Sequence, residues 1–194
     1  MNTATKVTMF RIFLIPVLVF TLLFPFNELG ILVKTVWIYG ASIKMTYIIA
    51  AVIFIIASIT DYVDGYIARK YDQVTDLGKF LDPIADKLLV NITLIILTSY
   101  GYISPIIVVV LIGRDIIVDA LRMMASKKGI VIAARSFGKF KTAFQMVGIA
   151  LTLMHNIPFV VFNIPVDKIS MYLAVLFSLL SAFDYFENSK DIFK

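Results

Sequence analysis

The chain has 194 residues, of which 60% are hydrophobic and 16% are charged. Soluble domains are about half apolar and about a quarter charged, so this composition argues against a soluble protein and predicts an integral membrane protein. Cysteine is absent, which excludes a disulfide framework and thiolate chemistry. The net charge of +5 comes from cations beside apolar segments, which favours lipid headgroups and phosphates over nucleic acid as partners.

Six apolar segments are candidates for membrane-spanning helices, each of which needs about 20 residues. The segment after Lys6 has no small-x-small cleavage site behind it, so we expect a retained anchor and no cleaved signal peptide. The uncharged stretch 88–113 is too long for one span, and Tyr100-Gly101 with Pro105 divides it into a helical hairpin. The sequence therefore predicts an all-α integral membrane protein, one domain over residues 1–194, with six transmembrane helices at 7–25, 44–66, 79–100, 104–127, 139–156 and 167–187.

Residues 27–41 lie between the first two predicted spans and have a mixed composition. Glu28, Gly30 and Lys34 interrupt an otherwise apolar segment, and Trp37 and Tyr39 suit a membrane interface. We expect a short helix on the outer surface here.

The cations are distributed unequally between the two sides of a six-span arrangement. Lys34, Lys44 and Lys168 fall on one side. The other side holds Lys6, Arg11, Arg69, Lys70, Lys79, Arg122, Lys127, Lys128, Arg135, Lys139, Lys141, Lys190 and Lys194. The positive-inside rule therefore predicts a multi-pass protein of the cell membrane with both termini in the cytoplasm.

Four aspartates stand near the ends of the second and third spans, where charged residues are costly and are by default functional. At about 100° per residue, the aspartates of each span and the small residues between them fall on one face of that helix. The small residues allow close contact between the two helices. These faces hold Asp61, Asp64, Gly65 and Ala68 on the second span, and Gly78, Asp82 and Asp86 on the third.

Clustered carboxylates repel one another unless cations lie between them. Oxygen ligands suit Mg²⁺, Mn²⁺ or Ca²⁺, and two such ions can clamp both oxygens of a phosphoryl transfer. Arg69 beside them could bind a phosphate through its fork of donors. A role in a helix cap or an interfacial ion pair would explain any one of the aspartates. It would not explain why carboxylates and small residues share the same helical spacing on two helices.

The pattern D-x₂-D-G-x₂-A-R-x₈-G-x₃-D-x₃-D resembles the signature of the CDP-alcohol phosphatidyltransferases. The chain matches every fixed position of it, namely Asp61, Asp64, Gly65, Ala68, Arg69, Gly78, Asp82 and Asp86. The resemblance implies a six-helix fold that forms a homodimer, with its site at the cytoplasmic membrane edge. It also implies transfer of a phosphatidyl group from a CDP-activated lipid to a small alcohol.

The resemblance also implies roles for single residues. Asp61, Asp64 and Asp82 would bind two Mg²⁺ or Mn²⁺ ions, with Asp86 as a further ligand or as the general base. The donor, CDP-diacylglycerol, would lie against residues of three segments. These are Thr8, Arg11, Asp61, Gly65, Ala68, Arg69 and Gly78. For Thr8 and Arg11 a simple topological anchor is an equal alternative.

A second polar cluster bears on the acceptor. Arg114, Asp115, Asp119 and Arg122 fall within about 140° of arc on the fourth span. Arg135, Lys139 and Lys141 follow at the start of the fifth, and such cationic density suits an anionic phosphate. These segments resemble the bacterial phosphatidylglycerophosphate synthases of the family. The implied acceptor is sn-glycerol 3-phosphate, and the implied products are phosphatidylglycerol phosphate and CMP.

Other interpretations remain open. The cations could form a loop that merely sets topology, and a sibling enzyme could use phosphatidylglycerol, inositol phosphate or serine as acceptor. A membrane transporter predicts carboxylates near the midplane and repeated halves, neither of which the sequence shows. A prenyl-transferring enzyme predicts adjacent aspartates and a largely soluble bundle, whereas this chain has D-x-x-D and six apolar segments.

Overall fold

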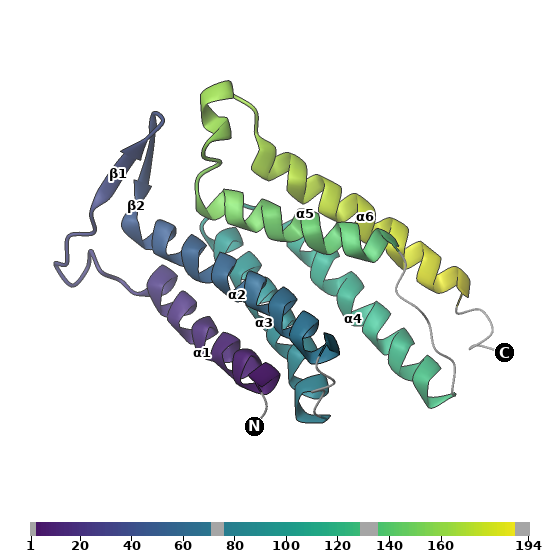
Figure 1. Ribbon diagram of the computed structural model, residues 1–194. Coiled ribbons are helices and arrows are strands. Elements are labelled where there is room, and N and C mark those ends of the chain that lie inside the picture. The colour runs from purple at the N-terminus through teal and green to yellow at the C-terminus, as the bar shows by residue number, and fades with distance from the viewer. Residues whose placement is uncertain (1–2, 71–75, 129–135, 189–194) are drawn as a thin grey trace.

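The computed structural model describes residues 3–70, 76–128 and 136–188, and side chains within 7–60, 81–128 and 136–187. Its described part is helical apart from one small hairpin (Figure 1). The six predicted apolar segments are confirmed as helices, with ends that shift by a few residues. They are α1 (Thr3–Leu23), α2 (Met45–Lys70), α3 (Asp76–Ser99), α4 (Pro105–Lys127), α5 (Ser136–Leu153) and α6 (Val166–Asn188).

The segment between α1 and α2 forms a β-hairpin, so the predicted short helix is wrong. Strands β1 (Thr35–Ile38) and β2 (Ala41–Lys44) pair antiparallel. The turn residues Tyr39 and Gly40 have φ values of 51° and 82°. Two consecutive positive φ angles match the twist of a two-residue hairpin turn, and the β-branched and aromatic residues of β1 favour a strand.

The predicted break between the third and fourth helices is confirmed. Gly101 has a φ of 76°, and its backbone N–H donates to the carbonyl of Thr98 over 2.9 Å. Pro105 then starts α4 in the first helical position, where its missing N–H costs no hydrogen bond. The uncharged stretch therefore folds back on itself as two antiparallel helices.

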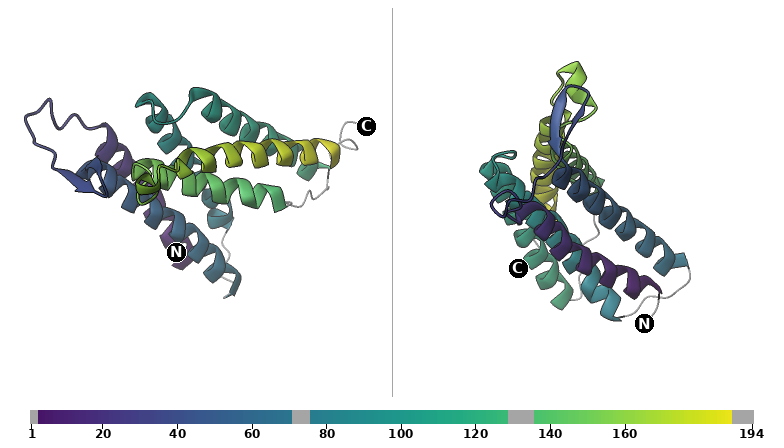
Figure 2. Two further views of the ribbon diagram at one scale, coloured as in Figure 1. Left: turned by 90° about the horizontal axis from the view of Figure 1, so that it is seen from above. Right: turned by 90° about the vertical axis from the view of Figure 1, so that its left-hand side faces the viewer.

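The helices pack as two groups that share one core. α1 packs on α2 and α3, whereas α6 packs along α5 and also contacts α4 (Figures 1 and 2). Leu18, Phe54 and Leu94 of the first group and Leu111 and Ile149 of the second are fully buried in the same apolar cluster. This core brings the polar ends of the two groups together.

Large apolar side chains also cover much of the outer surface. Phe13 of α1, Ile106 of α4 and Phe183 of α6 are 67%, 74% and 68% exposed. Within the described part, Val166–Glu187 is the one helix long and apolar enough to cross a membrane by length and composition. Val7–Leu23 and Met45–Thr60 are shorter apolar helices. Apolar surface on this scale indicates a lipid environment.

Candidate active site

One cavity is lined by Asp86 of the predicted aspartate cluster and by most of the second predicted polar cluster. It has a volume of about 680 Å³ and lies mainly between α3, α4 and α5, with Ser58 of α2 at its lining. Its polar lining from α3 is Asp86, Lys87 and Asn91, from α4 Arg114, Asp115, Asp119 and Arg122, and from α5 Lys139, Lys141 and Gln145. The cavity therefore brings the last aspartate of the motif to four of the five predicted phosphate-binding cations.

Asp82 and Asp86 lie one helical turn apart on α3, and both are partly buried. The Thr8 hydroxyl on α1 donates to Oδ1 of Asp82 over 2.5 Å. Thr8 and Arg11 are both buried, with 1% and 0% exposure. Because these two residues of α1 are buried, a purely topological role explains them poorly. The hydrogen bond places Thr8 directly against Asp82, a predicted metal ligand.

The rest of the motif falls where side chains are not described. Asp61, Asp64, Gly65, Ala68 and Arg69 lie in the last third of α2, and Gly78 lies in the first turn of α3. Their helical placement agrees with the prediction, but their side chains lie outside the described part. Arg135 lies outside the described residues altogether.

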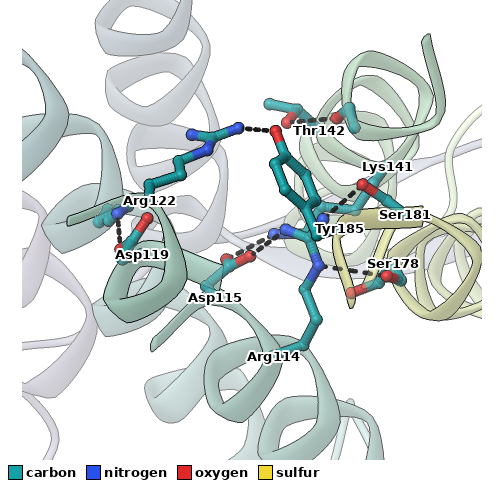
Figure 3. A network of polar contacts seen from close by, with 11 residues as sticks. Arg114, Asp115, Asp119, Arg122, Lys141, Thr142, Ser178, Ser181 and Tyr185 are labelled. Atoms are coloured by element: carbon teal, nitrogen blue, oxygen red, sulfur yellow. Dashed lines mark hydrogen bonds and ion pairs between the residues drawn. The ribbon is translucent and has the colours of Figure 1, made fainter. Parts of the chain in front are cut away.

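Asp115 is the hub of the network on the other side of the cavity (Figure 3). Its Oδ1 accepts a hydrogen bond from Arg114 over 3.0 Å, and its Oδ2 accepts one from Lys141 of α5 over 2.5 Å. Arg114 also donates to the Ser178 carbonyl over 3.1 Å and to the Ser181 hydroxyl over 2.5 Å. Arg114 therefore ties α4 to α6, while Asp115 ties α4 to α5.

Arg122 has a different environment, against an aromatic ring. Its guanidinium donates to the Tyr185 hydroxyl and lies 4.9 Å from the centroid of that ring, a cation–π distance. Tyr185 is buried on α6, whereas Arg122 is exposed toward the cavity (Figure 3). Lys139 is likewise exposed at the cavity lining. These two cations are therefore the most accessible to a ligand among the described ones of the predicted set.

Lys87 of α3 and Asp119 of α4 form an ion pair across the cavity lining. Their side chains are 40% and 35% exposed. Lys87 directly follows Asp86, so the pair joins the aspartate motif to the helix that carries Arg114 and Arg122.

Several of these residues were not predicted as site residues, although the sequence held signals for them. Ser178, Ser181 and Tyr185 are spaced three and four apart, which puts them on one face of an apolar helix. A polar stripe of this kind indicates buried polar partners, which are Arg114 for the Ser181 hydroxyl and Arg122 for the Tyr185 hydroxyl. Lys87 could have been considered because it adjoins Asp86.

The lining of the described cavity has a net positive charge. It holds the cations Lys87, Arg114, Arg122, Lys139 and Lys141 against the carboxylates Asp86, Asp115 and Asp119, a surplus of two positive charges. A phosphate monoester carries about −1.5 to −2 at neutral pH. The cavity can thus bind one such group with nearly complete charge compensation, beside a carboxylate that can accept a proton.

Comparison with known proteins agrees with this chemistry. The profile of the family "CDP-alcohol phosphatidyltransferase" matches residues 1–180. A Bacillus subtilis protein is 39% identical over 100% of this chain and 97% of its own length, and a Rickettsia bellii protein is 30% identical over 99% and 97%. A Mycoplasma genitalium protein is 41% identical over 77% of this chain and 63% of its own. All three are named CDP-diacylglycerol–glycerol-3-phosphate 3-phosphatidyltransferase.

Proposed function

Since the chain belongs to the CDP-alcohol phosphatidyltransferase family, we infer that it transfers the phosphatidyl group of CDP-diacylglycerol to sn-glycerol 3-phosphate. The products are phosphatidylglycerol phosphate and CMP, so the enzyme acts in phospholipid biosynthesis. The observation that carries this function is that Asp86 shares one cavity with Arg114, Arg122, Lys139 and Lys141. An acceptor whose phosphate lies on the cations can therefore direct its hydroxyl group toward the aspartate motif.

The net charge of the cavity supports the choice of acceptor. Glycerol 3-phosphate brings a dianionic phosphate, which matches the surplus of two positive charges among the described lining residues. Serine carries no phosphate, so the positive charges of Arg122 and Lys139 would remain uncompensated when serine is bound. The same argument admits inositol phosphate, so the acceptor must be distinguished by experiment.

We also propose that Asp61, Asp64, Asp82 and Asp86 hold two Mg²⁺ or Mn²⁺ ions. The described donors fit hard cations, since Asp82 and Asp86 offer only oxygen atoms and are spaced one turn apart on α3. Thr8 donates to Asp82, an outer-shell bond of the kind that orients a metal ligand. When bound, such ions would neutralise the diphosphate of the donor and polarise its phosphorus.

The chain's own residues supply the remaining steps. In this proposal Asp86 takes the proton from the acceptor hydroxyl, which is supported by its position in the cavity lining. The acceptor oxygen forms a bond to the β-phosphorus of the donor, and the bond from that phosphorus to the CMP oxygen breaks. Arg69, through the role that the resemblance gives it, would stabilise the charge on the departing CMP.

We propose that the enzyme lies in the cell membrane with six spans, both termini cytoplasmic and the active site at the cytoplasmic face. The exposed apolar side chains of α1, α4 and α6 support a lipid-facing surface. Charged residues line the cavity of the site, where a headgroup can stay hydrated. The homodimer implied by the resemblance is part of the proposal. Cross-linking in native membranes would test that dimer.

The function is tested with purified protein in detergent, CDP-diacylglycerol and each acceptor in turn, with CMP release and the lipid product measured. We expect release with glycerol 3-phosphate, dependent on Mg²⁺ or Mn²⁺ and lost in Asp61→Asn and Asp86→Asn. Release with inositol phosphate or serine instead would keep the phosphatidyl transfer and overturn the acceptor. No release with any acceptor, from protein that retains its helical content, would contradict the function itself.

A further inference from the structure

The active site lies at the junction of the two helix groups, and each group supplies one half of it. The aspartate motif belongs to the group of α1, α2 and α3, whereas Arg114, Arg122, Lys139 and Lys141 belong to the group of α4, α5 and α6. The Thr8–Asp82 bond stays within the first group. The Asp115–Lys141 pair and the bond from Arg114 to Ser181 stay within the second. These contacts shape each half but do not fix the halves relative to each other.

The Lys87–Asp119 ion pair does join them. Lys87 directly follows Asp86, the proposed general base, on α3. Asp119 stands on α4 one turn after Asp115 and three residues before Arg122, on the face that lines the cavity (Figure 3). The pair therefore links the backbone beside the base to the helix that carries the acceptor's cations.

Its energetic contribution to folding is small. Side chains that are 40% and 35% exposed form an ion pair that water screens, and such pairs add little to stability. Hydrogen-bonded charges can nevertheless hold a geometry. A displacement of about 1 Å between reacting groups can reduce the rate by roughly 100-fold.

We propose that Lys87 and Asp119 are positioning residues that set the register of the donor half of the site against the acceptor half. This inference rests on the proposed function, because it needs a donor and an acceptor that meet between the two groups. The pair acts on the turnover step, in which both substrates are bound, and not on the affinity for either substrate.

A direct role of Lys87 is the main competitor of this inference. Lys87 lines the cavity and could bind the acceptor phosphate itself. In that case its loss would raise the KM for glycerol 3-phosphate, and removal of Asp119 would lower that KM by freeing a cation. A positioning pair instead lowers kcat in every variant, and in the double variant, which keeps the net charge of the cavity lining, it leaves both KM values nearly unchanged.

A double-mutant cycle separates the two roles. Lys87→Met, Asp119→Asn and the double variant are assayed for CMP release while each substrate is varied in turn. We expect kcat to fall by roughly 10-fold in all three, because the second substitution removes nothing once the pair is broken. The conservative Lys87→Arg variant, which can keep the pair, retains most of the wild-type kcat. Lys168→Met, an exposed lysine near the other end of the molecule, is the matched control and keeps wild-type kinetics.

Four results would overturn the inference. Two are kinetic effects of another kind: losses in kcat that multiply in the double variant, or an effect of the substitutions confined to the KM for glycerol 3-phosphate. The other two are unchanged kinetics in all variants, and loss of helical circular dichroism in both single variants. A failure of the proposed function looks different, since the wild-type enzyme itself would then release no CMP with glycerol 3-phosphate.

Discussion

The Lys141 ammonium group on α5 lies 2.5 Å from one oxygen of Asp115 on α4, and Arg114 lies 3.0 Å from the other oxygen. The side chains of Lys141 and Asp115 are only 7% and 15% exposed. One carboxylate thus compensates two cations from two helices where little water reaches them. This arrangement keeps the cationic wall of the cavity assembled when no substrate phosphate is present.

Removal of this carboxylate should destabilise the fold. Asp115→Ala leaves two largely buried cations without their shared counter-ion, and breaking a buried pair costs about 3–5 kcal/mol in the free energy of unfolding. Added inorganic phosphate should recover part of this loss, since an anion bound to the folded state stabilises it. Thermal unfolding in detergent with and without phosphate measures both effects. Asp167→Ala, in the first turn of α6, is the control, and a variant at position 115 as stable as that control would contradict the prediction.

Arg122 should contribute to acceptor affinity. A hydrogen bond to a charged group is worth about 1.5–3 kcal/mol, so Arg122→Met should raise the KM for glycerol 3-phosphate by roughly 10- to 100-fold. The KM for CDP-diacylglycerol should stay unchanged, because the donor binds to the other half of the site. Lys127→Met serves as the control, since Lys127 lies on the same helix but outside the cavity lining. A change in the donor KM alone would refute this assignment.

The Thr8 hydroxyl should lower the concentration of Mg²⁺ or Mn²⁺ that the enzyme needs for activity. Thr8→Val removes the donor to Asp82, and loss of an outer-shell partner typically weakens metal affinity by about 10- to 100-fold. The concentration of Mg²⁺ or Mn²⁺ needed for half-maximal activity should rise accordingly, and Thr8→Ser should restore it. In the control Thr21→Val the lost hydroxyl donates to the Val17 carbonyl of its own helix. An equal metal requirement in both valine variants would show that Thr8 does not act through Asp82.

Close packing of α5 on α6 depends on Gly148. A Cβ atom at this position would lie 2.7 Å from Sδ and 3.0 Å from Cγ of Met171, which is itself buried. Gly148→Leu should therefore lower the free energy of unfolding by about 1–3 kcal/mol through overpacking. Gly113→Leu is the matched control, because nothing lies within 4 Å of its added Cβ. Similar unfolding temperatures for the two variants would rule out the predicted clash.

The absence of cysteine makes the membrane orientation directly testable. Tyr39→Cys places a thiol at the hairpin turn, where the side chain is 68% exposed, and Lys127→Cys places one at the end of α4. In intact cells a membrane-impermeant maleimide should label position 39 but not position 127. After permeabilisation it should label both. Labelling of position 127 from outside would reverse the proposed topology.

The sequence alone predicted the six helices, the break at Gly101 and the aspartate motif. These features depend on apolar run length, on local turn chemistry and on spacing along one helix, all of which are properties of neighbouring residues. The short helix expected within residues 27–41 is wrong for a local reason as well. The β-branched and aromatic residues of β1 favour a strand, and the positive φ angles of Tyr39 and Gly40 close the hairpin turn.

Only the tertiary structure decided which side chains meet. Periodicity placed Arg114, Asp115, Asp119 and Arg122 on one face of α4, but not the partners that each would take. Arg114 donates a hydrogen bond to Ser181 of α6, and Asp119 forms an ion pair with Lys87 of α3. Such pairings join residues that are 67 and 32 positions apart in the chain. They depend on how the helices pack on a shared apolar core, because that packing brings polar groups of different helices together, and no local spacing along the chain contains that information.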